Sequence, residues 1–416
     1  MTFALVKAAP ALRPLGFSAR PERDRRRRHC SSARFNLVAA SSSSSQPSSS
    51  SPRPQQQPPP LLRPAPEGPS HPPIVVVALG GNALLRRGEE PTAANQRRHA
   101  AEAAAATARL FFETFDSKVR LVITHGNGPQ VGLLASAQPL EQLGVLDAET
   151  QGAIGLTLAN GIDKALSSFS SDSSNAIPPS ICLVTRVVVS ADDTAFSLPP
   201  TKPIGPGISK ERAEELSQGN PGLRFVEEDG GRLLRRAVPS PSPVSIVEID
   251  SIRKLLSCES SGASPVGPII CGGGGGVPVV VVAGEDPKST SDSRPDSDLS
   301  PVEAVIDKDA TSELLASLLG ASALLLLTDA EALYAPEEWE ASRAEKRRPR
   351  AVKSPATPEE VEALLPGLPE GSMRPKAAAA ARAARGGVVA GIGSLVDATE
   401  ILMGTKGTLV VPSDET

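Results

Sequence analysis

Aromatic residues, histidine and cysteine are all scarce in this chain of 416 residues. Aromatics make up 3% of the sequence, so the core has to be built from Val, Leu, Ile and Ala. The four cysteines show no C-x-x-C spacing, which argues against a disulfide scaffold and a cysteine zinc site. The chain has four histidines and no H-E-x-x-H motif, which argues against a zinc site of that type. Any catalysis is therefore expected to depend mainly on lysine, carboxylate and backbone amide groups. His99 is expected to be exposed on an Ala-rich helix, and His125 is either close to a ligand or a loop imidazole bonded to the backbone.

Long apolar runs and a uniform charge are also missing. No run reaches the roughly 18 apolar residues of a transmembrane helix, so no membrane partner is predicted. Charge is nearly balanced, with 43 Lys and Arg against 47 Asp and Glu. Residues 1–66 nevertheless carry a net charge of +9, which leaves −13 on the remainder. An acidic body lacks the basic face that nucleic acid requires, so nucleic-acid binding is not predicted.

Residues 1–71 differ from the rest of the chain in composition. They are rich in Arg, Ser, Pro and Gln, poor in acidic residues and without an apolar period, so they cannot bury enough surface to fold. This composition is typical of an organelle transit peptide followed by a disordered linker. The Ser and Pro content favours a plastid (chloroplast), with a mitochondrion as the alternative. A disordered tail without an address function is the other interpretation.

Residues 72–416 are predicted to form one α/β domain with a mostly parallel sheet. Strands are expected at 74–79, 120–124, 181–189, 268–271, 277–283, 323–327 and 388–392, with helices between them. Residues 199–243, rich in Pro, Gly and charge, are predicted to form a small lobe outside this sheet. Residues 289–300, rich in Ser and Asp, are expected to be a surface insertion.

Three glycine clusters each follow a predicted buried strand. They contain Gly80 and Gly81, then Gly126 and Gly128, then five glycines at 272–276. Parallel strands end at the ligand-binding edge of a sheet, and glycine lets backbone N–H groups approach a phosphate there. Each cluster alone is also compatible with an ordinary tight turn. The chain has no G-x-x-x-x-G-K-[ST] and no G-x-G-x-x-G, which argues against a P-loop enzyme and a dinucleotide site. Together the clusters predict binding of an anionic ligand.

Three lysines lie in sequence contexts that suggest catalysis. Lys202 belongs to T-K-P-I-G-P, Lys308 lies between Asp307 and Asp309, and Lys376 follows G-S-M-R-P. Phosphoryl transfer depends mainly on positioning and on neutralising the charge of the moving group. Ammonium groups supply that neutralisation, and a carboxylate such as Asp309 can hold them in place. The alternative for each lysine is a solvated surface charge.

The order of these motifs resembles that of the carbamate kinases, in the amino-acid kinase superfamily. The match covers roughly residues 74–411 and includes V-V-A-L-G-G-N-A at 76–83, T-H-G-N-G-P-Q-V-G at 124–132, T-K-P-I-G-P at 201–206, V-I-D-K-D at 305–309 and G-S-M-R-P-K at 371–376. The T-K-P-I-G-P and V-I-D-K-D elements separate this family from acetylglutamate, aspartate and uridylate kinases.

The resemblance implies a three-layer αβα sandwich with a mostly parallel eight-stranded sheet, assembled as a homodimer. It implies reversible phosphoryl transfer between carbamoyl phosphate plus ADP and carbamate plus ATP, with Mg²⁺ accompanying the nucleotide and no metal held by protein ligands. Lys308 and Lys376 would neutralise the transition state, Asp309 would orient them, and Lys202 would close over the substrate. The other implied contacts are Gly80, Gly81 and Asn82 to the phosphoryl group, Gly126, Asn127 and Gly128 to the carbamoyl end, and Gly273, Gly274, Gly275, Gly276, Thr328 and Asp329 to the nucleotide.

The chain departs from the family pattern in two places. Many relatives in the superfamily carry a lysine on the first strand, where this chain has Ala78, and Lys308 is the expected replacement. The family often has G-R-G-W after the acidic pair near Asp229, where this chain has G-G-R-L-L, which bears on the small lobe. The alternatives are another small-carboxylate kinase, such as an acetylglutamate kinase, and a non-catalytic nucleotide-binding regulator on the same fold.

Overall fold

The computed structural model describes residues 73–81, 89–90, 92–114, 119–128, 130–138, 141–169, 177–228, 231–257, 266–282 and 298–413. The predictions for the leader at 1–71, for Asn82 and for most of the insertion at 289–300 lie outside these residues. Among the helices in these ranges, none has the length and apolar character needed to cross a bilayer.

The main sheet contains seven strands within the described ranges, where the resemblance implies eight. Their order is β14-β13-β12-β1-β2-β9-β3, and the described neighbours are all parallel except β13 and β14. The strands are β1 (Ile74–Leu79), β2 (Arg120–His125), β3 (Ile181–Cys182), β9 (Ile269–Ile270), β12 (Ala323–Thr328), β13 (Val389–Ser394) and β14 (Thr408–Val410). The predicted mostly parallel sheet is therefore confirmed.

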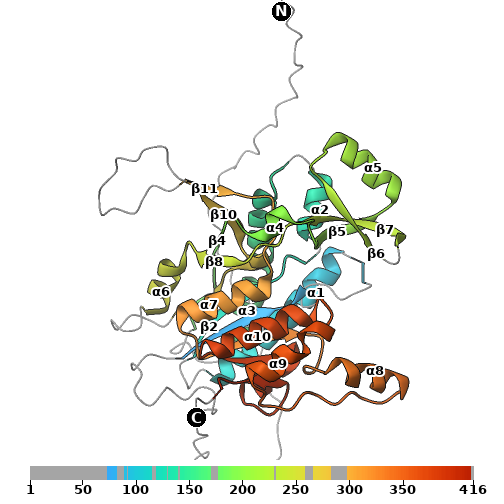
Figure 1. The fold of residues 1–416 in the computed structure, drawn as a ribbon. Helices are drawn as coiled ribbons and strands as arrows, with labels where there is room; N and C mark the ends of the chain where they lie inside the picture. The colour runs from blue at the N-terminus through green and yellow to red at the C-terminus, as the bar shows by residue number, and fades with distance from the viewer. Residues whose placement is uncertain are drawn as a thin grey trace, which may run out of the picture. The chain divides into compact units, whose positions relative to one another are not determined.

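Helices cover both faces of the main sheet, which gives the three expected layers (Figure 1). On β1, Val76 and Ala78 pack in the cluster formed with α7 (Lys308–Leu319) and α10 (Met373–Arg385). Val75 and Val77 point to the other face, toward α1 (Ala93–Thr114) and α3 (Leu143–Phe169). A strand buried on both faces has no polar alternation, which explains the unbroken apolar run in the sequence.

Shorter helices complete the layers. They are α2 (Gln130–Ala137), α4 (Thr194–Ser197), α5 (Lys210–Gly219), α6 (Ile249–Ser257), α8 (Pro336–Ala344), α9 (Pro358–Leu364) and α11 (Ala398–Leu402). Neither α8 nor α9 was predicted, although each has proline at its start, where the missing N–H costs nothing. Thr357 and Glu360 add a capping box to α9, a signal that the sequence did contain.

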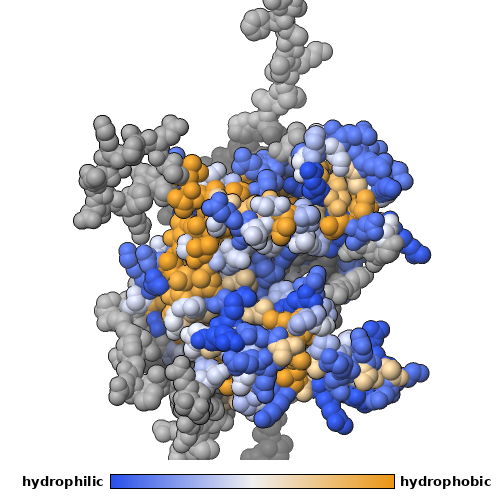
Figure 2. Space-filling view, in the orientation of Figure 1, coloured by the Kyte–Doolittle hydropathy of each residue, from blue (hydrophilic) through white to orange (hydrophobic). Residues whose placement is uncertain are grey.

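The single strand predicted at 181–189 is wrong. After β3 the chain leaves the main sheet, and β4 (Arg186–Val189) joins a second sheet with the order β11-β10-β4-β8. The chain makes the same transition between β9 and β10 (Val277–Val282). The two transitions meet at Thr185, whose Oγ1 accepts from Gly272 N–H and whose backbone O accepts from Val277 N–H, each at 2.9 Å. The other members are β8 (Pro243–Ile246) and β11 (Asp298–Pro301). Figure 2 shows an apolar surface over this second sheet, where Val281 is 53% exposed.

A third, antiparallel sheet of order β5-β7-β6 occupies most of residues 199–243. It consists of β5 (Lys202–Ile208), β6 (Arg224–Glu228) and β7 (Leu233–Val238), with α5 between the first two. It packs closely on α2. Gly132 of α2 and Gly205 of β5 are so near each other that a Cβ on Gly132 would lie 1.9 Å from Gly205 Cα. Lys202 is the first residue of β5, so this sheet carries one of the three lysines.

His99 is not exposed, contrary to the prediction. It lies on α1 with 2% of its surface accessible, and its Nε2 is 2.5 Å from Glu89 Oε2. The composition of the helix gave no sign of this partner, because Glu89 precedes α1 and lies outside its periodic pattern.

Candidate active site

The first two glycine loops lie next to each other at the carboxyl edge of the main sheet. Gly80 N–H donates to Leu327 O at 3.0 Å, and Gly126 N–H donates to Leu79 O at 3.2 Å. A Cβ on Gly80 would lie 2.9 Å from the Leu327 carbonyl oxygen, so a larger residue does not fit there. A Cβ on Gly126 would lie 3.5 Å from Gly81 Cα, so the two loops are in contact.

The third glycine loop packs against the second. The five glycines at 272–276 include four with positive φ, at 272, 274, 275 and 276, and most of the loop is buried. A Cβ on Gly274 would lie 2.0 Å from Asn127 Oδ1. Thr311 Oγ1 donates to Gly275 O at 2.8 Å, which ties the loop to α7. Close packing and left-handed backbone therefore account for glycine here, and the expected nucleotide contact stays a prediction.

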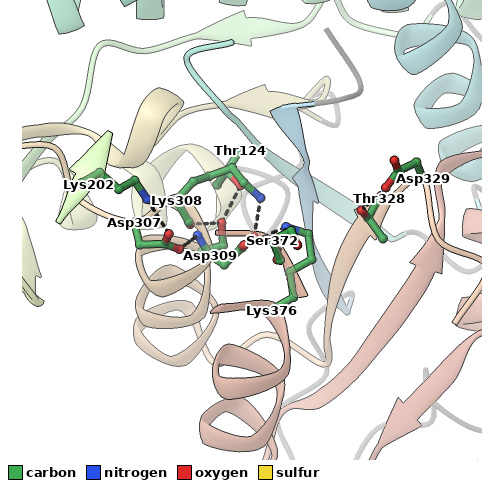
Figure 3. Close-up of polar contacts among 10 residues, drawn as sticks. Thr124, Lys202, Asp307, Lys308, Asp309, Thr328, Asp329, Ser372 and Lys376 are labelled. Carbon is green, nitrogen blue, oxygen red and sulfur yellow. Dashed lines mark hydrogen bonds and ion pairs between the residues drawn. The ribbon is translucent and has the colours of Figure 1, made fainter. Parts of the chain in front are cut away.

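Lys308, Asp309 and Lys376 form one buried cluster, shown in Figure 3. Lys308 Nζ is 2.5 Å from Asp309 Oδ1, and Lys376 Nζ is 3.0 Å from Asp309 Oδ2. Lys308 and Asp309 come from the start of α7, whereas Lys376 comes from the first turn of α10. Two segments almost 70 residues apart along the chain thus place two ammonium groups on the two oxygens of one carboxylate.

The cluster carries a net positive charge in a buried place. Burial lowers the pKa of Lys308, and the carboxylate of Asp309 acts against that effect. Burial also disfavours ionised Asp309, but Lys308 and Lys376 outweigh it and hold the pKa of Asp309 below its usual range. Asp309 is therefore ionised at neutral pH. With both lysines protonated, one positive charge lacks a counter-ion within the cluster, which favours an anionic ligand.

Asp307 connects Lys202 to this cluster. One of its carboxylate oxygens caps α7 by accepting from Asp309 N–H at 2.9 Å. Its other oxygen lies 2.7 Å from Lys202 Nζ. Both side chains are about 30% exposed, so this pair is accessible to solvent while Lys308 and Lys376 are not. From the sequence, Asp307 was expected only as a neighbour of Lys308, although its position before a predicted helix is the signal for a cap.

Ala78 lies on the face of the main sheet that packs against α7, the helix that begins with Lys308. Ala78 belongs to the cluster on the α7 side of the sheet, and it pairs with Thr124 on β2. Thr124 Oγ1 shares a hydrogen bond of 2.6 Å with Ser312, whose hydroxyl also donates to Lys308 O at 2.7 Å. The start of α7 is thus tied to β2 next to Ala78.

Thr328 and Asp329 lie apart from the lysine cluster (Figure 3). Thr328 ends β12, and its hydroxyl donates to Asp329 Oδ1 at 3.0 Å. Three strand spacings separate β12 from β9, about 14 Å at the usual spacing. These two residues and the third glycine loop therefore flank the first two loops from opposite sides, and the structure does not bring them together.

Asn127 is fixed by α3, a contact that the sequence analysis missed. Its side-chain Nδ2 donates to Asp147 Oδ1 at 2.9 Å, and its Oδ1 accepts from Thr150 Oγ1 at 3.0 Å. Burial raises the pKa of Asp147 well above its usual range. The neighbouring His125 is bonded to the backbone, which is one of the two alternatives expected for it. Its Nδ1 lies 3.0 Å from Gly126 O. Burial lowers the pKa of His125 to about 4, so this imidazole is neutral at pH 7.

Two comparisons with known proteins identify the family. The profile of the amino acid kinase family matches residues 73–392. Carbamate kinase 2 of Staphylococcus aureus (strain MRSA252) is 37% identical over 307 residues, which cover 71% of this chain and 87% of that relative. This chain belongs to the carbamate kinases of the amino acid kinase family. The resemblance found in the motifs is confirmed.

Solved structures agree with this carbamate kinase assignment. Carbamate kinase from Giardia lamblia bound to AMP-PNP is 31% identical with a TM-score of 0.65, covering 82% of this chain and 99% of that one. A protein from Aeropyrum pernix K1 is 35% identical with a TM-score of 0.69, covering 82% of this chain and all of that one. Both comparisons extend over nearly the whole of the solved chains, so the fold is that of the carbamate kinases.

The described part of this carbamate kinase contains no group of three or more His, Cys, Asp and Glu side chains arranged to hold a metal ion. Asp309 already contacts a lysine with each carboxylate oxygen. Mg²⁺ commonly binds to nucleotide phosphates and keeps several of its waters.

Proposed function

We propose that this protein is a carbamate kinase that transfers a phosphoryl group reversibly between carbamoyl phosphate and ADP, with carbamate and ATP as the other pair. One observation carries this proposal beyond family membership. The buried Lys308–Asp309–Lys376 cluster places positive charge at the start of α7, the helix that Thr311 ties to the third glycine loop. A transferred phosphoryl group needs this environment, because its charge spreads over three equatorial oxygens in the transition state.

In the direction of ATP formation, an oxygen of the ADP β-phosphate attacks the phosphorus of carbamoyl phosphate. The bond between that phosphorus and the carbamate oxygen breaks, and carbamate leaves with the electron pair. Lys308 and Lys376 neutralise the oxygens of the moving group, and Asp309 fixes the direction of both ammonium groups. Lys202 leaves Asp307 and closes over the substrate, which its exposure on β5 allows.

The glycine loops supply backbone contacts. We assign Gly80, Gly81 and Asn82 to the phosphoryl group, and the loop of Gly126, Asn127 and Gly128 to the carbamoyl end. Support comes from the contact between these loops, with a Gly126 Cβ position 3.5 Å from Gly81 Cα. Mg²⁺ enters with ADP or ATP. We assign Thr328, Asp329 and the loop containing Gly273, Gly274, Gly275 and Gly276 to the nucleotide.

The homodimer, the leader and the organelle belong to the same proposal. Large apolar side chains stay exposed in the described part of the chain, among them Leu156 on α3 at 60% and Val281 on β10 at 53%. Such surfaces favour a second copy as partner, and light scattering on the wild type and on Leu156→Glu tests this. Residues 1–71 act as a plastid transit peptide with a linker, followed by the kinase domain at 72–416. A fluorescent fusion of residues 1–71 in plant cells tests the organelle.

The decisive experiment is an ATP assay on the full chain. Carbamoyl phosphate, ADP and Mg²⁺ should yield ATP, and Lys376→Ala should abolish most of the rate. Lys406→Ala is the matched control, because Lys406 pairs with Asp397 on the surface. A folded protein that forms no ATP contradicts the proposal. A reverse assay with acetylglutamate, aspartate and carbamate as acceptors separates this enzyme from other small-carboxylate kinases.

A further inference from the structure

Asn127 is the most constrained residue of the loop proposed to receive the carbamoyl end. Its amide nitrogen donates to Asp147 and its amide oxygen accepts from Thr150, at 2.9 and 3.0 Å. The exposed fractions of these residues are 8%, 2% and 1% for Asn127, Asp147 and Thr150. Asp147 and Thr150 lie one turn apart on α3, so a single rigid helix contacts both ends of the amide.

Both contacts hold the amide against one face of α3. Thr150 Oγ1 also lies 2.9 Å from Asp147 O, so the hydroxyl is held within the helix. A hydroxyl has a single proton, for which Asp147 O and Asn127 Oδ1 compete. The Asn127 amide is therefore held from two points on α3.

The fixed amide also supports the third glycine loop. Gly274 approaches Asn127 so closely that a Cβ would lie 2.0 Å from Asn127 Oδ1. The backbone of Asn127 continues into Gly128, whose φ of 53° makes the turn toward α2. A displacement of the Asn127 side chain would therefore be transmitted to both loops, since neither has space to absorb it.

We propose that Asp147 is a positioning residue for the substrate loop, acting through Asn127 to hold Gly126, Asn127 and Gly128 in the conformation that binds the carbamoyl end of the substrate. This inference rests on the proposed function. It also assigns a purpose to a buried acid that the phosphoryl-transfer step does not use. Burial raises the pKa of Asp147 and the hydrogen bond from Asn127 opposes that rise, so the amide is the partner that offsets the cost of burying this carboxyl group.

The test compares Asp147→Ala with Asp147→Asn in steady-state kinetics of the full chain. Asp147→Ala should raise KM for carbamoyl phosphate about tenfold, the scale of a lost buried hydrogen bond, and leave KM for ADP within about twofold. Asp147→Asn should restore KM to within about threefold of the wild type, since its side-chain oxygen can accept from Asn127. Asp163→Ala is the matched control, because Asp163 lies on the same helix and accepts from Ser180 N–H at 2.8 Å.

Two results overturn the proposal. One is an unchanged KM for carbamoyl phosphate in folded Asp147→Ala. The other is an equal effect of Asp147→Ala and Asp163→Ala on both substrates, which would indicate a structural role only. If Asp147→Ala does not fold, Thr150→Val replaces it, because this variant removes the second hydrogen bond and keeps the side-chain shape. An unchanged KM in Thr150→Val would then count against the proposal.

Hydrogen exchange distinguishes failure of this inference from failure of the proposed function. If the wild type forms no ATP, the proposed function fails, and exchange of the backbone amides at 125–128 decides on Asp147. Faster exchange of these amides in Asp147→Ala than in Asp163→Ala supports the positioning role. Equal exchange in the two variants overturns it. The Gly126 N–H, bonded to Leu79 O at 3.2 Å, is the most direct reporter.

Discussion

Replacing Asp309 with Asn tests the lysine cluster most directly. The change keeps the size of the side chain and removes the charge shared by Lys308 and Lys376. Asn offers one acceptor oxygen and one amide nitrogen, so one ammonium group keeps a partner and the other meets a donor. The variant leaves two ammonium groups in a buried site without the carboxylate that holds them.

The structure sets the size of the effect. Removing one partner of a buried ion pair costs about 3–5 kcal/mol, and Asp309 is the common partner in two. We therefore expect the free energy of unfolding at pH 7 to fall by at least about 3 kcal/mol. Loss of oriented charge at the phosphoryl group should lower kcat about a hundredfold, as for other transition-state donors. KM for carbamoyl phosphate should not rise, because the site becomes more positive toward an anion in the ground state.

The pH dependence has a defined sign. The pKa of Asp309 is held below its usual range in the folded protein. Its stabilising contribution is therefore complete above the unfolded pKa of about 3.9 and is lost as pH falls through the lower folded value. The difference in stability between the wild type and Asp309→Asn should be full at pH 7 and should shrink below about pH 4.

Denaturant unfolding at several pH values and ATP-formation kinetics measure these quantities. Asp250→Asn is the control, because Asp250 forms an exposed ion pair with Arg253 at 3.0 Å, and such a pair contributes about 0–1 kcal/mol. A folded Asp309→Asn with kcat within about threefold of the wild type would refute the proposed role of the cluster. A loss of activity explained by KM alone would also refute it.

Three further predictions follow from neighbouring contacts. Lys376→Ala should lower kcat by at least about a hundredfold with little change in nucleotide affinity; titration calorimetry with ADP beside the ATP assay checks this. Asp307→Asn keeps the cap of α7 but weakens the hold on Lys202. Activity should therefore change, whereas the free energy of unfolding should stay within about 1 kcal/mol of the wild type. Kinetics and thermal unfolding measure the two quantities. Gly274→Ala should destabilise the protein by about 1–3 kcal/mol. The loss should exceed that of Gly320→Ala, because both glycines have positive φ but only Gly274 lacks space for a Cβ. Denaturant unfolding compares the two variants.

Local sequence signals predicted most of the main sheet. The apolar runs of β1, β2 and β12 identified buried parallel strands, and the glycines after β1 and β2 marked the edge where these two loops meet. The lysines were recognisable because proline, glycine or aspartate surrounds each of them. These signals are local, since burial on both faces and tight turns impose their composition over a few residues.

Partnerships between distant segments could not be predicted in the same way. Periodicity identified 181–189 as extended, but it does not say which sheet a residue joins, and the hydrogen bonds at Thr185 separate β3 from β4. His99 is buried and pairs with Glu89, and the Asp147 side chain lies against Asn127. Side-chain pairing of this kind depends on the tertiary structure, so the sequence pattern carries no trace of it.

The charge of the chain and the charge of the site have opposite signs, and the helix starts explain how. Lys308 and Lys376 both lie in the first turn of a helix, where the dipole disfavours a cation. Two helix starts and two ammonium groups create positive potential that a net charge of −4 does not suggest. Asp307 and Asp309 make this arrangement stable without substrate, because one caps α7 and the other binds both lysines. A phosphoryl group can then compete with Asp309 for the same ammonium groups, so the carboxylate that stabilises the free protein also tunes how strongly the site binds its anion.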